Sequence, residues 1–385
     1  MNVSDKIKYV GVDDLDIDLF ESQYVVPEGM SYNSYVILDE KTAVMDTVDA
    51  RKTDEWINNV KVALGGKNLD YIVCLHMEPD HAGSMMKAME TFPTAKVVGN
   101  AKTFTYMAQF FDVNLEGRKV EVKDGESLSL GEHNLTFVCA PMVHWPEVMV
   151  AYESSEKVLF AADAFGKFGA ISKYDGDWAC EARRYYFNIC GKYGVQVQSL
   201  LKKAAALDIK TIAPLHGPVL KENLGYYLDL YNTWSSYGVE SEGVLVAFAS
   251  IHGNTRKAAE KIASILEKQG AKKVVVSDLS RDDEAEVIED AFRYGRMIIA
   301  APTYDGGLFP PMESFLSHLK SKNYQKRTVG IIENGTWAPM SGKLMKAALE
   351  SMKEIKICDT VVTIKSALKA EQEDSLVALA KEVLA

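Results

Sequence analysis

The sequence contains no long hydrophobic run and few cysteines, and each absence removes a class of protein. A membrane-spanning helix needs about 18 or more consecutive apolar residues, and no apolar stretch of this chain reaches that length. The opening residues, MNVSDKIKYV, lack the basic start and apolar core of a secretion signal, so we expect a cytoplasmic protein with no membrane partner. The five cysteines form no C-x-x-C pair, which argues against a disulfide framework and against thiolate-bound zinc or iron–sulfur sites.

Basic residues are also in short supply. The chain has 43 lysines and arginines against 54 aspartates and glutamates, for a formal net charge of −11. Proteins that bind nucleic acid through phosphate contacts carry the opposite balance, so we expect no nucleic-acid partner. The pattern G-x-x-x-x-G-K-[ST] is missing as well, and no nucleoside triphosphate is indicated.

The length of 385 residues predicts about two domains. In the first half, residues 35–47, YVIL-DEK-TAVMDT, predict two short strands joined by a turn, and residues 53–64 carry apolar side chains at helical spacing. The segment VMVAY-ESSEK-VLFAA predicts a second hairpin. The later strands expected in this half are Tyr71–Leu75, Lys96–Gly99, Leu135–Cys139, Glu147–Tyr152, Val158–Ala162 and Lys210–Ala213.

The apolar pattern breaks at YGVESEG, residues 237–243, and we place the boundary there, between domains of residues 1–240 and 244–385. Beyond it, the strand patterns VLVAFAS, KVVVSD, MIIAAPT, TVGIIEN and VVTIK alternate with helical patterns. The helices expected are Thr255–Lys268, a segment near Asp283–Tyr294, Pro311–Ser321, Ser341–Met352 and Glu371–Leu384. This alternation predicts an open, doubly wound parallel sheet and an α/β fold class.

Potential metal ligands follow four expected strands of the first half. The stretch LHMEPDHAGS, residues 75–84, supplies two histidines and two carboxylates at the end of one strand, and three other strands each deliver one more residue. Side chains at strand ends are held on a rigid base, where ligands can be placed accurately. The candidate ligands are His76, Glu78, Asp80, His81, His144, Asp163 and His216. The other histidines, His133, His252 and His318, are assigned to turn, loop and helix-surface positions.

Four histidines and three carboxylates are too many ligands for one metal and suit two metals that share a carboxylate. Carboxylates harden a site and favour iron or manganese over zinc. Three carboxylates and a bridging hydroxide would neutralise two divalent ions, so the site can be buried without a large uncompensated charge. The series H-x-E-x-D-H, H, D, H resembles the metallo-β-lactamase superfamily, whose first motif is H-x-H-x-D-H; here Glu78 replaces the middle histidine.

Three loops of the second half form a second candidate site. A strand-to-helix turn rich in small residues follows VLVAFAS and presents backbone N–H groups that can bind phosphate at a helix N-terminus. Two further loops follow parallel strands, and each carries an aromatic ring that can stack on a flat heterocycle. The alternatives are an N-cap turn without a ligand and two aromatic rings that merely pack on their loops. The candidate residues are Ser250, Ile251, His252, Gly253, Asn254, Thr255, Pro302, Thr303, Tyr304, Asp305, Gly306, Asn334, Gly335, Thr336, Trp337 and Ala338.

A phosphate loop with two aromatic loops resembles flavodoxin, which implies FMN. A lactamase-like domain carrying Glu78, followed by a flavodoxin-like domain, resembles the flavodiiron protein family over nearly the whole chain. The strings YNSY, HWPE, ADAFG and LHGP are similar to family signatures. The resemblance implies a metallo-β-lactamase-like αββα sandwich followed by a flavodoxin-like doubly wound parallel sheet.

The resemblance also implies how the site residues are used. One iron takes His76, Glu78 and His144, the other takes Asp80, His81 and His216, and Asp163 bridges them, with His81 the ligand whose role depends on small ring rotations. FMN passes electrons to this diiron centre, which reduces dioxygen to water, nitric oxide to nitrous oxide, or both, typically to protect anaerobes. Tyr185 and Tyr186 are implied to line the pocket for the diatomic substrate, although two aromatic residues on a packed helix explain them equally well.

The implied partners are a separate electron donor and a second copy of the chain. No rubredoxin-like C-x-x-C pair is present, so we expect rubredoxin as a separate donor that docks at a local basic or apolar patch. The resemblance implies a head-to-tail homodimer in which one flavin faces the partner's metals, and the choice between dimer and tetramer stays open. Two other functions remain open: a two-metal hydrolase with a regulatory flavodoxin domain, and a pure electron carrier whose first domain has lost its chemistry.

Overall fold

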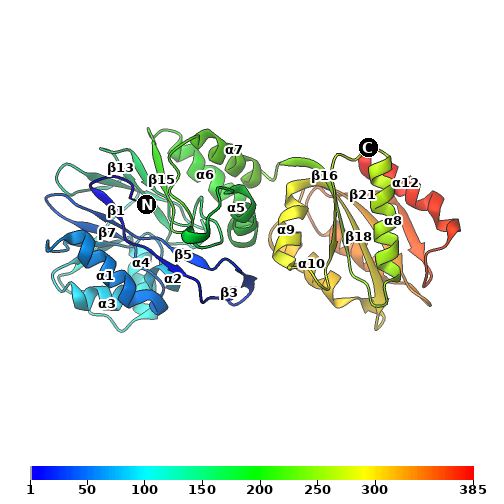
Figure 1. Cartoon of the computed structure of the whole chain (residues 1–385), viewed down its shortest axis with the longest axis horizontal. Coiled ribbons are helices and arrows are strands. Elements are labelled where there is room, and N and C mark those ends of the chain that lie inside the picture. Colours follow the sequence, from blue (N-terminus) through cyan, green and yellow to red (C-terminus); the bar gives the residue numbers. More distant parts are fainter. Residues whose placement is uncertain (1) are drawn as a thin grey trace. The chain divides into compact units, whose positions relative to one another are not determined.

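The computed structural model describes residues 2–385 and divides into two compact units (Figure 1). The first unit contains the chain up to Tyr186 together with Tyr193–Asn232, and the second contains Phe187–Lys192 and Thr233–Ala385. The segment 237–243, where we placed the domain boundary, lies in the second unit and includes the start of its first strand. Among residues 2–385, no helix combines the length and the apolar character needed to cross a membrane.

Two mixed sheets form the centre of the first unit. The first sheet has six strands in the spatial order β1 (Ile7–Tyr9), β6 (Tyr35–Ile37), β7 (Ala43–Met45), β8 (Tyr71–Val73), β9 (Lys96–Gly99) and β10 (Lys119–Glu121). The second has five, in the order β11 (Ser127–Ser129), β12 (Asn134–Cys139), β13 (Met149–Glu153), β14 (Val158–Phe160) and β15 (Thr211–Ala213). Two small antiparallel ribbons pair β2 (Val12–Asp14) with β5 (Met30–Tyr32) and β3 (Leu19–Phe20) with β4 (Tyr24–Val25).

Helices cover the two sheets of this unit, as Figure 1 shows for α1 and α4 on one side and for α6 and α7 on the other. They are α1 (Thr53–Leu64), α2 (Pro79–Ala82), α3 (Met85–Thr91), α4 (Ala101–Phe110), α5 (Ala179–Tyr185), α6 (Gly194–Ala204) and α7 (Leu224–Ser235). Two short 3-10 helices of this unit are Ala50–Lys52 and Ile171–Lys173. The π-helix Tyr186–Cys190 and the 3-10 helix Gly191–Tyr193 lie mostly in the segment that belongs to the second unit. The expected lactamase-like αββα sandwich is confirmed.

Pairing within these sheets brings the ends of the ligand-bearing strands to one edge. Strands β7, β8 and β9 run parallel, as do β14 and β15, so their carboxyl ends point the same way within each sheet. Strands β7, β14 and β15 are buried along their whole length, which is typical of parallel strands covered on both faces. The predicted hairpins β6–β7 and β13–β14 are confirmed as antiparallel pairs.

The second unit is an open parallel sheet with helices on both faces. Its strands lie in the order β17 (Val274–Asp278), β16 (Ser241–Phe248), β18 (Tyr294–Tyr304), β20 (Thr328–Asn334) and β21 (Lys356–Ile364), and the two-residue β19 (Gly307–Leu308) pairs antiparallel with β18. The helices are α8 (Asn254–Lys268), α9 (Glu284–Arg293), α10 (Pro310–Ser321), α11 (Ser341–Glu350) and α12 (Glu373–Leu384), with a 3-10 turn at Ala370–Gln372. Helices α8 and α12 share an apolar core with the sheet, and the predicted flavodoxin-like fold is confirmed.

Several predicted boundaries need correction. Strand β8 ends at Val73 rather than Leu75, β13 begins at Met149 rather than Glu147, and β14 ends at Phe160 rather than Ala162. In each case the residues left out of the strand lead into or out of a ligand loop. His133 lies in a turn, as expected, but its side chain is buried and pairs with two carboxylates rather than facing solvent.

Candidate functional site

Loops at the ends of β8, β12, β14 and β15 bring all seven candidate ligands together. Six of the seven side chains are buried, and Glu78 is 13% exposed. They form two groups, and within each group the potential ligand atoms lie within 4.8 Å of one another. The first group is His76, Glu78, His144 and Asp163, and the second is Asp80, His81 and His216. Asp80 and His81 sit on the single-turn helix α2, which begins at Pro79 directly after Glu78.

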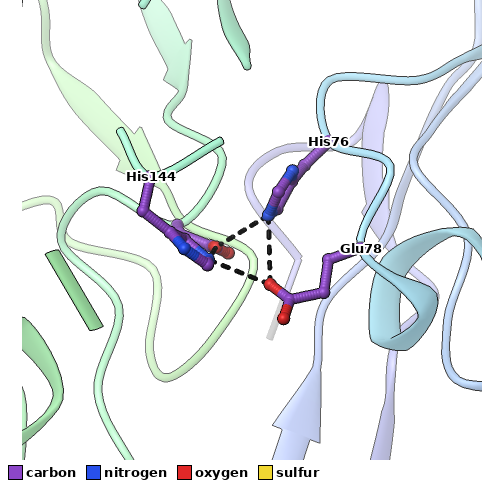
Figure 2. A group of neighbouring side chains, drawn as sticks. His76, Glu78 and His144 are labelled. Atoms are coloured by element: carbon purple, nitrogen blue, oxygen red, sulfur yellow. Dashed lines mark hydrogen bonds and ion pairs between the residues drawn. The ribbon is translucent and has the colours of Figure 1, made fainter. Parts of the chain in front are cut away.

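The first group converges on one point. Figure 2 shows the side chains of His76, Glu78 and His144 directed toward one another. Oε2 of Glu78 lies 3.2 Å from Nε2 of His76 and 2.9 Å from Nε2 of His144. Oδ2 of Asp163 lies 3.3 Å and 3.1 Å from the same two nitrogens. Two imidazole nitrogens and two carboxylate oxygens therefore face a common centre, an arrangement suited to a divalent cation.

The second group converges in the same way on the other oxygen of Asp163. Oδ2 of Asp80 lies 3.2 Å from Nε2 of both His81 and His216. Oδ1 of Asp163 lies 3.1 Å from Nε2 of His81 and 3.7 Å from Nε2 of His216. Asp163 thus offers one oxygen to each group, which is the geometry of a carboxylate bridging two metals.

The polar atoms of this cluster fit metal binding better than mutual hydrogen bonding. Several of them are buried and have no hydrogen-bond partner: both carboxylate oxygens of Asp80 and Asp163, and Nε2 of His81 and His216. Buried polar atoms without partners are rare in native proteins and call for an ion or another group. Burial opposes ionisation of Asp163, but its neighbours His76 and His81 hold the pKa of its carboxyl well below the usual range. The bridging position is therefore anionic, as a metal ligand requires.

Hydrogen bonds behind the cluster orient two of its histidines. Nδ1 of His76 lies 2.8 Å from Oε1 of Glu147, which also accepts the backbone N–H of Met77 at 2.9 Å. Nδ1 of His216 lies 2.7 Å from the carbonyl oxygen of Ser31. Donation from Nδ1–H to these acceptors leaves the Nε2 lone pair free for a metal, as in many metal sites. Sequence reasoning missed Glu147 and Ser31 as supporting residues.

Asp46 supports the ligand loop through its backbone. Its Oδ1 accepts the N–H of Leu75 at 2.7 Å and the N–H of His76 at 3.3 Å. Asp46 itself lies at the end of β7 in the left-handed region, with φ of 53°. Sequence reasoning missed this residue as well, although its place after a buried strand in TAVMDT was a usable signal.

The two candidate pocket tyrosines lie in different surroundings. The ring of Tyr185 lies 5.4 Å from the ring of His216 and 5.1 Å from Phe168, centroid to centroid, so it packs beside the metal cluster. The ring of Tyr186 packs instead on Tyr231, at 5.2 Å. Both side chains are fully buried. The ring of Tyr185 therefore lies beside a candidate metal ligand, His216.

The second candidate site is a cavity of about 550 Å³ at the carboxyl edge of the sheet in the second unit. All the predicted residues of the three loops line it except Gly253, which is the N-cap of α8 with φ of 80°. Met340 and Ser366 also line the cavity and were not predicted. Oγ1 of Thr303 accepts the N–H of Met340 at 2.8 Å, which ties two of the loops together.

Aromatic rings flank this cavity. Trp337 is 81% exposed and Tyr304 is 45% exposed, although both are large apolar side chains in a unit with a well-packed core. Exposed aromatic rings beside a cavity are typical of a site that binds a flat heterocycle. Asn254 and Thr255, the first residues of α8, line the same cavity. The free backbone N–H groups of a helix N-terminus can stabilise a phosphate.

Comparisons with known proteins cover both units. A family model described as "ODP family beta lactamase" matches residues 30–217, and one described as "Flavodoxin domain" matches residues 245–362. The chain is 30% identical over 324 residues to an uncharacterized protein of Methanocaldococcus jannaschii, covering 83% of this chain and 81% of that one. It is 29% identical over 393 residues to a nitric oxide reductase of Moorella thermoacetica, covering 100% and 98%.

Solved structures show the same two-unit architecture. The rubredoxin:oxygen oxidoreductase of Desulfovibrio gigas superposes with a TM-score of 0.92 at 25% identity, covering 100% of this chain and 97% of that one. The flavodiiron protein of Giardia intestinalis superposes with a TM-score of 0.93 at 24% identity, covering 99% and 96%, and supports the fold.

Proposed function

The chain belongs to the flavodiiron protein family, and from this premise we propose that it reduces dioxygen to water, nitric oxide to nitrous oxide, or both, at a diiron centre supplied with electrons by FMN. It is an oxidoreductase, as are the relatives named nitric oxide reductase and rubredoxin:oxygen oxidoreductase. This activity needs both sites: the candidate metal centre of the first unit and the candidate FMN cavity of the second.

The observation that carries the proposal is the position of Asp163. Its two carboxylate oxygens face two separate groups of histidines and carboxylates, so the chain offers two adjacent cation sites with one shared ligand. Glu78 supplies oxygen where the superfamily pattern has an imidazole, and harder ligands favour iron. When bound, two neighbouring irons can supply two electrons at once to a diatomic molecule, and FMN can receive electrons in pairs and release them singly.

Side chains of the first unit would hold the cations and limit access of water to them. Glu147 and the Ser31 carbonyl fix the rings of His76 and His216 from behind. The rings of Phe20 and Tyr185 lie 5.5 Å and 5.4 Å from the ring of His216, so this flank of the cluster is apolar. An apolar flank admits neutral diatomic molecules more readily than water or ions.

We propose that the residues of the second cavity bind FMN. Asn254 and Thr255 begin α8, and its backbone N–H groups would hold the phosphate, while Trp337 and Tyr304 would offer aromatic rings to the flat flavin ring. This cavity counts against the hydrolase alternative, which has no use for a flavin. It leaves the pure electron carrier as the second candidate, and the intact set of ligands counts against that one.

We further propose a cytoplasmic location, a separate rubredoxin-type donor, and a head-to-tail homodimer in which the flavin of one chain serves the metals of the other. Because net charge is −11, an acidic donor would have to dock on a local basic or apolar patch. The exposed rings of Trp337 and Tyr304 provide an apolar patch beside the flavin cavity.

One anaerobic experiment tests the proposed function. The purified protein is analysed for iron and flavin, reduced fully, and mixed separately with dioxygen and with nitric oxide while flavin reoxidation is followed. We expect two irons and one flavin per chain and reoxidation by at least one gas. A fully loaded protein that neither gas reoxidises would refute the reductase function, and zinc in place of iron would favour the hydrolase.

A further inference from the structure

An oxidisable aromatic ring packs directly against the candidate metal centre. The ring of Trp145 lies 5.3 Å from the ring of His76 at an interplanar angle of 88°, and 6.2 Å from the ring of His144, centroid to centroid. Both histidines belong to the first metal group. Trp145 follows His144 directly in the chain, so its backbone is fixed by the same loop that places a ligand. The indole is therefore in van der Waals contact with a metal-binding ring.

Helix α4 continues this contact toward the surface. The ring of Tyr106 lies 6.4 Å from the ring of Trp145, in an edge-on orientation, and Phe110 stacks on Trp145 at 6.4 Å. Tyr106 is partly exposed and Phe110 is 45% exposed, so this side of Trp145 reaches solvent. Tyr106 and Phe110 are four residues apart and thus share one face of the helix. The order from centre to surface is His76, Trp145, Tyr106.

Other tyrosines beside the cluster offer no comparable route. Tyr32 and Tyr185 lie 6.2 Å and 5.4 Å from the ring of His216, and both are fully buried. The hydroxyl of Tyr32 accepts a hydrogen bond from the guanidinium of Arg51 at 2.9 Å, and this phenol has no solvent exposure of the kind that Tyr106 has. Trp145 therefore contacts a candidate ligand, His76, on one side and the partly exposed phenol of Tyr106 on the other.

We propose that Trp145 and Tyr106 form a one-electron path that connects the diiron centre to solvent and protects the protein when its flavin delivers too few electrons. The inference rests on the proposed dioxygen reduction. Indole and phenol are the side chains that give up a single electron most readily, apart from thiols. Complete reduction of one dioxygen to two waters consumes four electrons and four protons. If the flavin and irons hold only three electrons, one must come from the protein.

The balanced path has three steps. The Trp145 indole gives one electron toward dioxygen at the centre and releases its Nε1 proton, which leaves a neutral indolyl radical. That radical takes one electron and one proton from the phenol of Tyr106 and becomes indole again. The tyrosyl radical at the surface then takes a hydrogen atom from a small thiol in solution, and two thiyl radicals combine to a disulfide. The electron missing from the flavin is thus drawn from solvent thiols, and no side chain stays damaged.

The test uses the holoprotein with iron and FMN bound, reduced with fewer electrons than one dioxygen requires, then mixed with excess dioxygen and frozen rapidly for electron paramagnetic resonance. We expect a tyrosyl radical in the unchanged protein. Tyr106→Phe should replace it with an indolyl signal, and Trp145→Phe should reduce the total radical signal by more than half. Tyr71→Phe, a tyrosine at the opposite end of β8, is the matched control and should leave the spectrum unchanged. An unchanged spectrum in both test variants would overturn the path.

A second measurement keeps the inference separate from the proposed function and from effects on folding. Fully reduced samples of the same variants are mixed with dioxygen, and flavin reoxidation shows whether reduction itself occurs. Tyr106→Phe should reoxidise at the unchanged rate, yet lose activity sooner than the Tyr71→Phe control over repeated turnovers with limiting donor. Peptide mass spectrometry should then find oxygen added to Trp145. Oxygen added instead at Tyr32 or Tyr185, with Trp145 intact, would refute the path even if reduction proceeds normally.

Discussion

A single carboxylate lies between the two groups of candidate metal ligands. Asp163 faces one group of ligands with Oδ2 and the other with Oδ1. We expect Asp163→Asn to lower iron content from two per chain to one or none and to abolish gas reduction, because an amide lacks the charge and the second strong donor oxygen. Metal analysis of the purified variant checks this. Asp16→Asn, at a carboxylate that is 93% exposed, is the control and should keep both irons.

Glu147 has no direct place in the metal groups, yet it positions His76. Its Oε1 accepts hydrogen bonds from the ring of His76 and from the N–H of Met77. We expect Glu147→Gln to weaken iron binding by about 10–100-fold, the usual effect of losing a charged partner behind a histidine ligand. Competition with a coloured chelator measures the affinity. Equal affinity in the variant and the unchanged protein would show that His76 is held by other contacts.

Residue types and spacing sufficed to predict which candidate ligands lie together, but not the residues that support them. The seven candidates were predictable because each follows an apolar strand and because histidines are rare in the chain. Glu147 and Ser31 carry no such signal: they lie 71 and 185 positions from the histidines that they orient. Contacts between distant positions depend on how the two sheets pack, and no local pattern reports that.

At the scale of elements, the start of α8 should bind the phosphate of FMN and should therefore contribute to the binding of FMN but not of riboflavin. Its first residues, Asn254 and Thr255, line the candidate FMN cavity, and the helix runs for 15 residues. We expect Asn254→Asp to weaken FMN binding by about 1.4 kcal/mol, or roughly ten-fold, because the new carboxylate repels the phosphate. Binding of riboflavin, which lacks the phosphate, should be unchanged. Fluorescence titration of the apoprotein with both flavins measures the two affinities. An equal loss of affinity for both flavins would indicate a distorted loop instead.

The turn between β11 and β12 contains a buried histidine that ties three turns together. Nδ1 of His133 lies 2.8 Å from Asp39, which follows β6, and Nε2 lies 3.2 Å from Glu156, which follows β13. Burial disfavours protonation, but hydrogen bonds to Asp39 and Glu156 and the nearby charge of Glu153 raise the pKa of His133 above its ordinary value. The same contacts lower the pKa of Asp39 to about 2, against the effect of burial, so that carboxylate stays ionised.

This arrangement predicts a pH-dependent contribution to stability. A raised folded-state pKa means that the contribution of His133 is complete below its unfolded value of about 6.5 and is lost as pH rises through the folded-state pKa. We expect His133→Gln to lower the free energy of unfolding by about 1.5–3 kcal/mol at low pH, the range for hydrogen bonds between charged groups. The difference should shrink at alkaline pH. Urea unfolding at about pH 6 and pH 9.5 measures it, and a difference that grows with pH would contradict the assignment.

The existence of elements was easier to predict than their ends or their order. The helix Thr53–Leu64 was predictable because Trp56, Ile57, Val60 and Leu64 recur on one face, and all four are buried. Strands β1 to β5 were not predicted, since they are only two or three residues long and two of the pairs stand outside the main sheets. The order β17-β16-β18-β20-β21 also lay beyond local patterns, because it depends on crossovers between strands distant in the sequence.

At the scale of the whole molecule, the sequence and the structure of one chain define two sites, and the family resemblance implies that electrons pass between them across a dimer. Complementation can test this directly. Asp163→Asn is expected to keep a working flavin site and lose the metal centre, while Asn254→Asp, once its more weakly held FMN has been removed by dialysis, keeps the metals and lacks flavin. Neither variant alone should reduce either gas with electrons from the donor.

Mixed dimers then distinguish electron transfer between the two chains from electron transfer within one chain. If each flavin serves the partner's metals, a dimer of the two variants contains one intact pair, formed by the flavin of the Asp163→Asn chain and the metals of the Asn254→Asp chain. We expect co-expression with separate affinity tags to yield mixed dimers with about half the activity per dimer of the unchanged protein, since one of the two sites works. If electrons pass within one chain, neither chain of the mixed dimer is complete and activity stays at zero. Added FMN at high concentration should restore the Asn254→Asp homodimer, which confirms that its metals were intact.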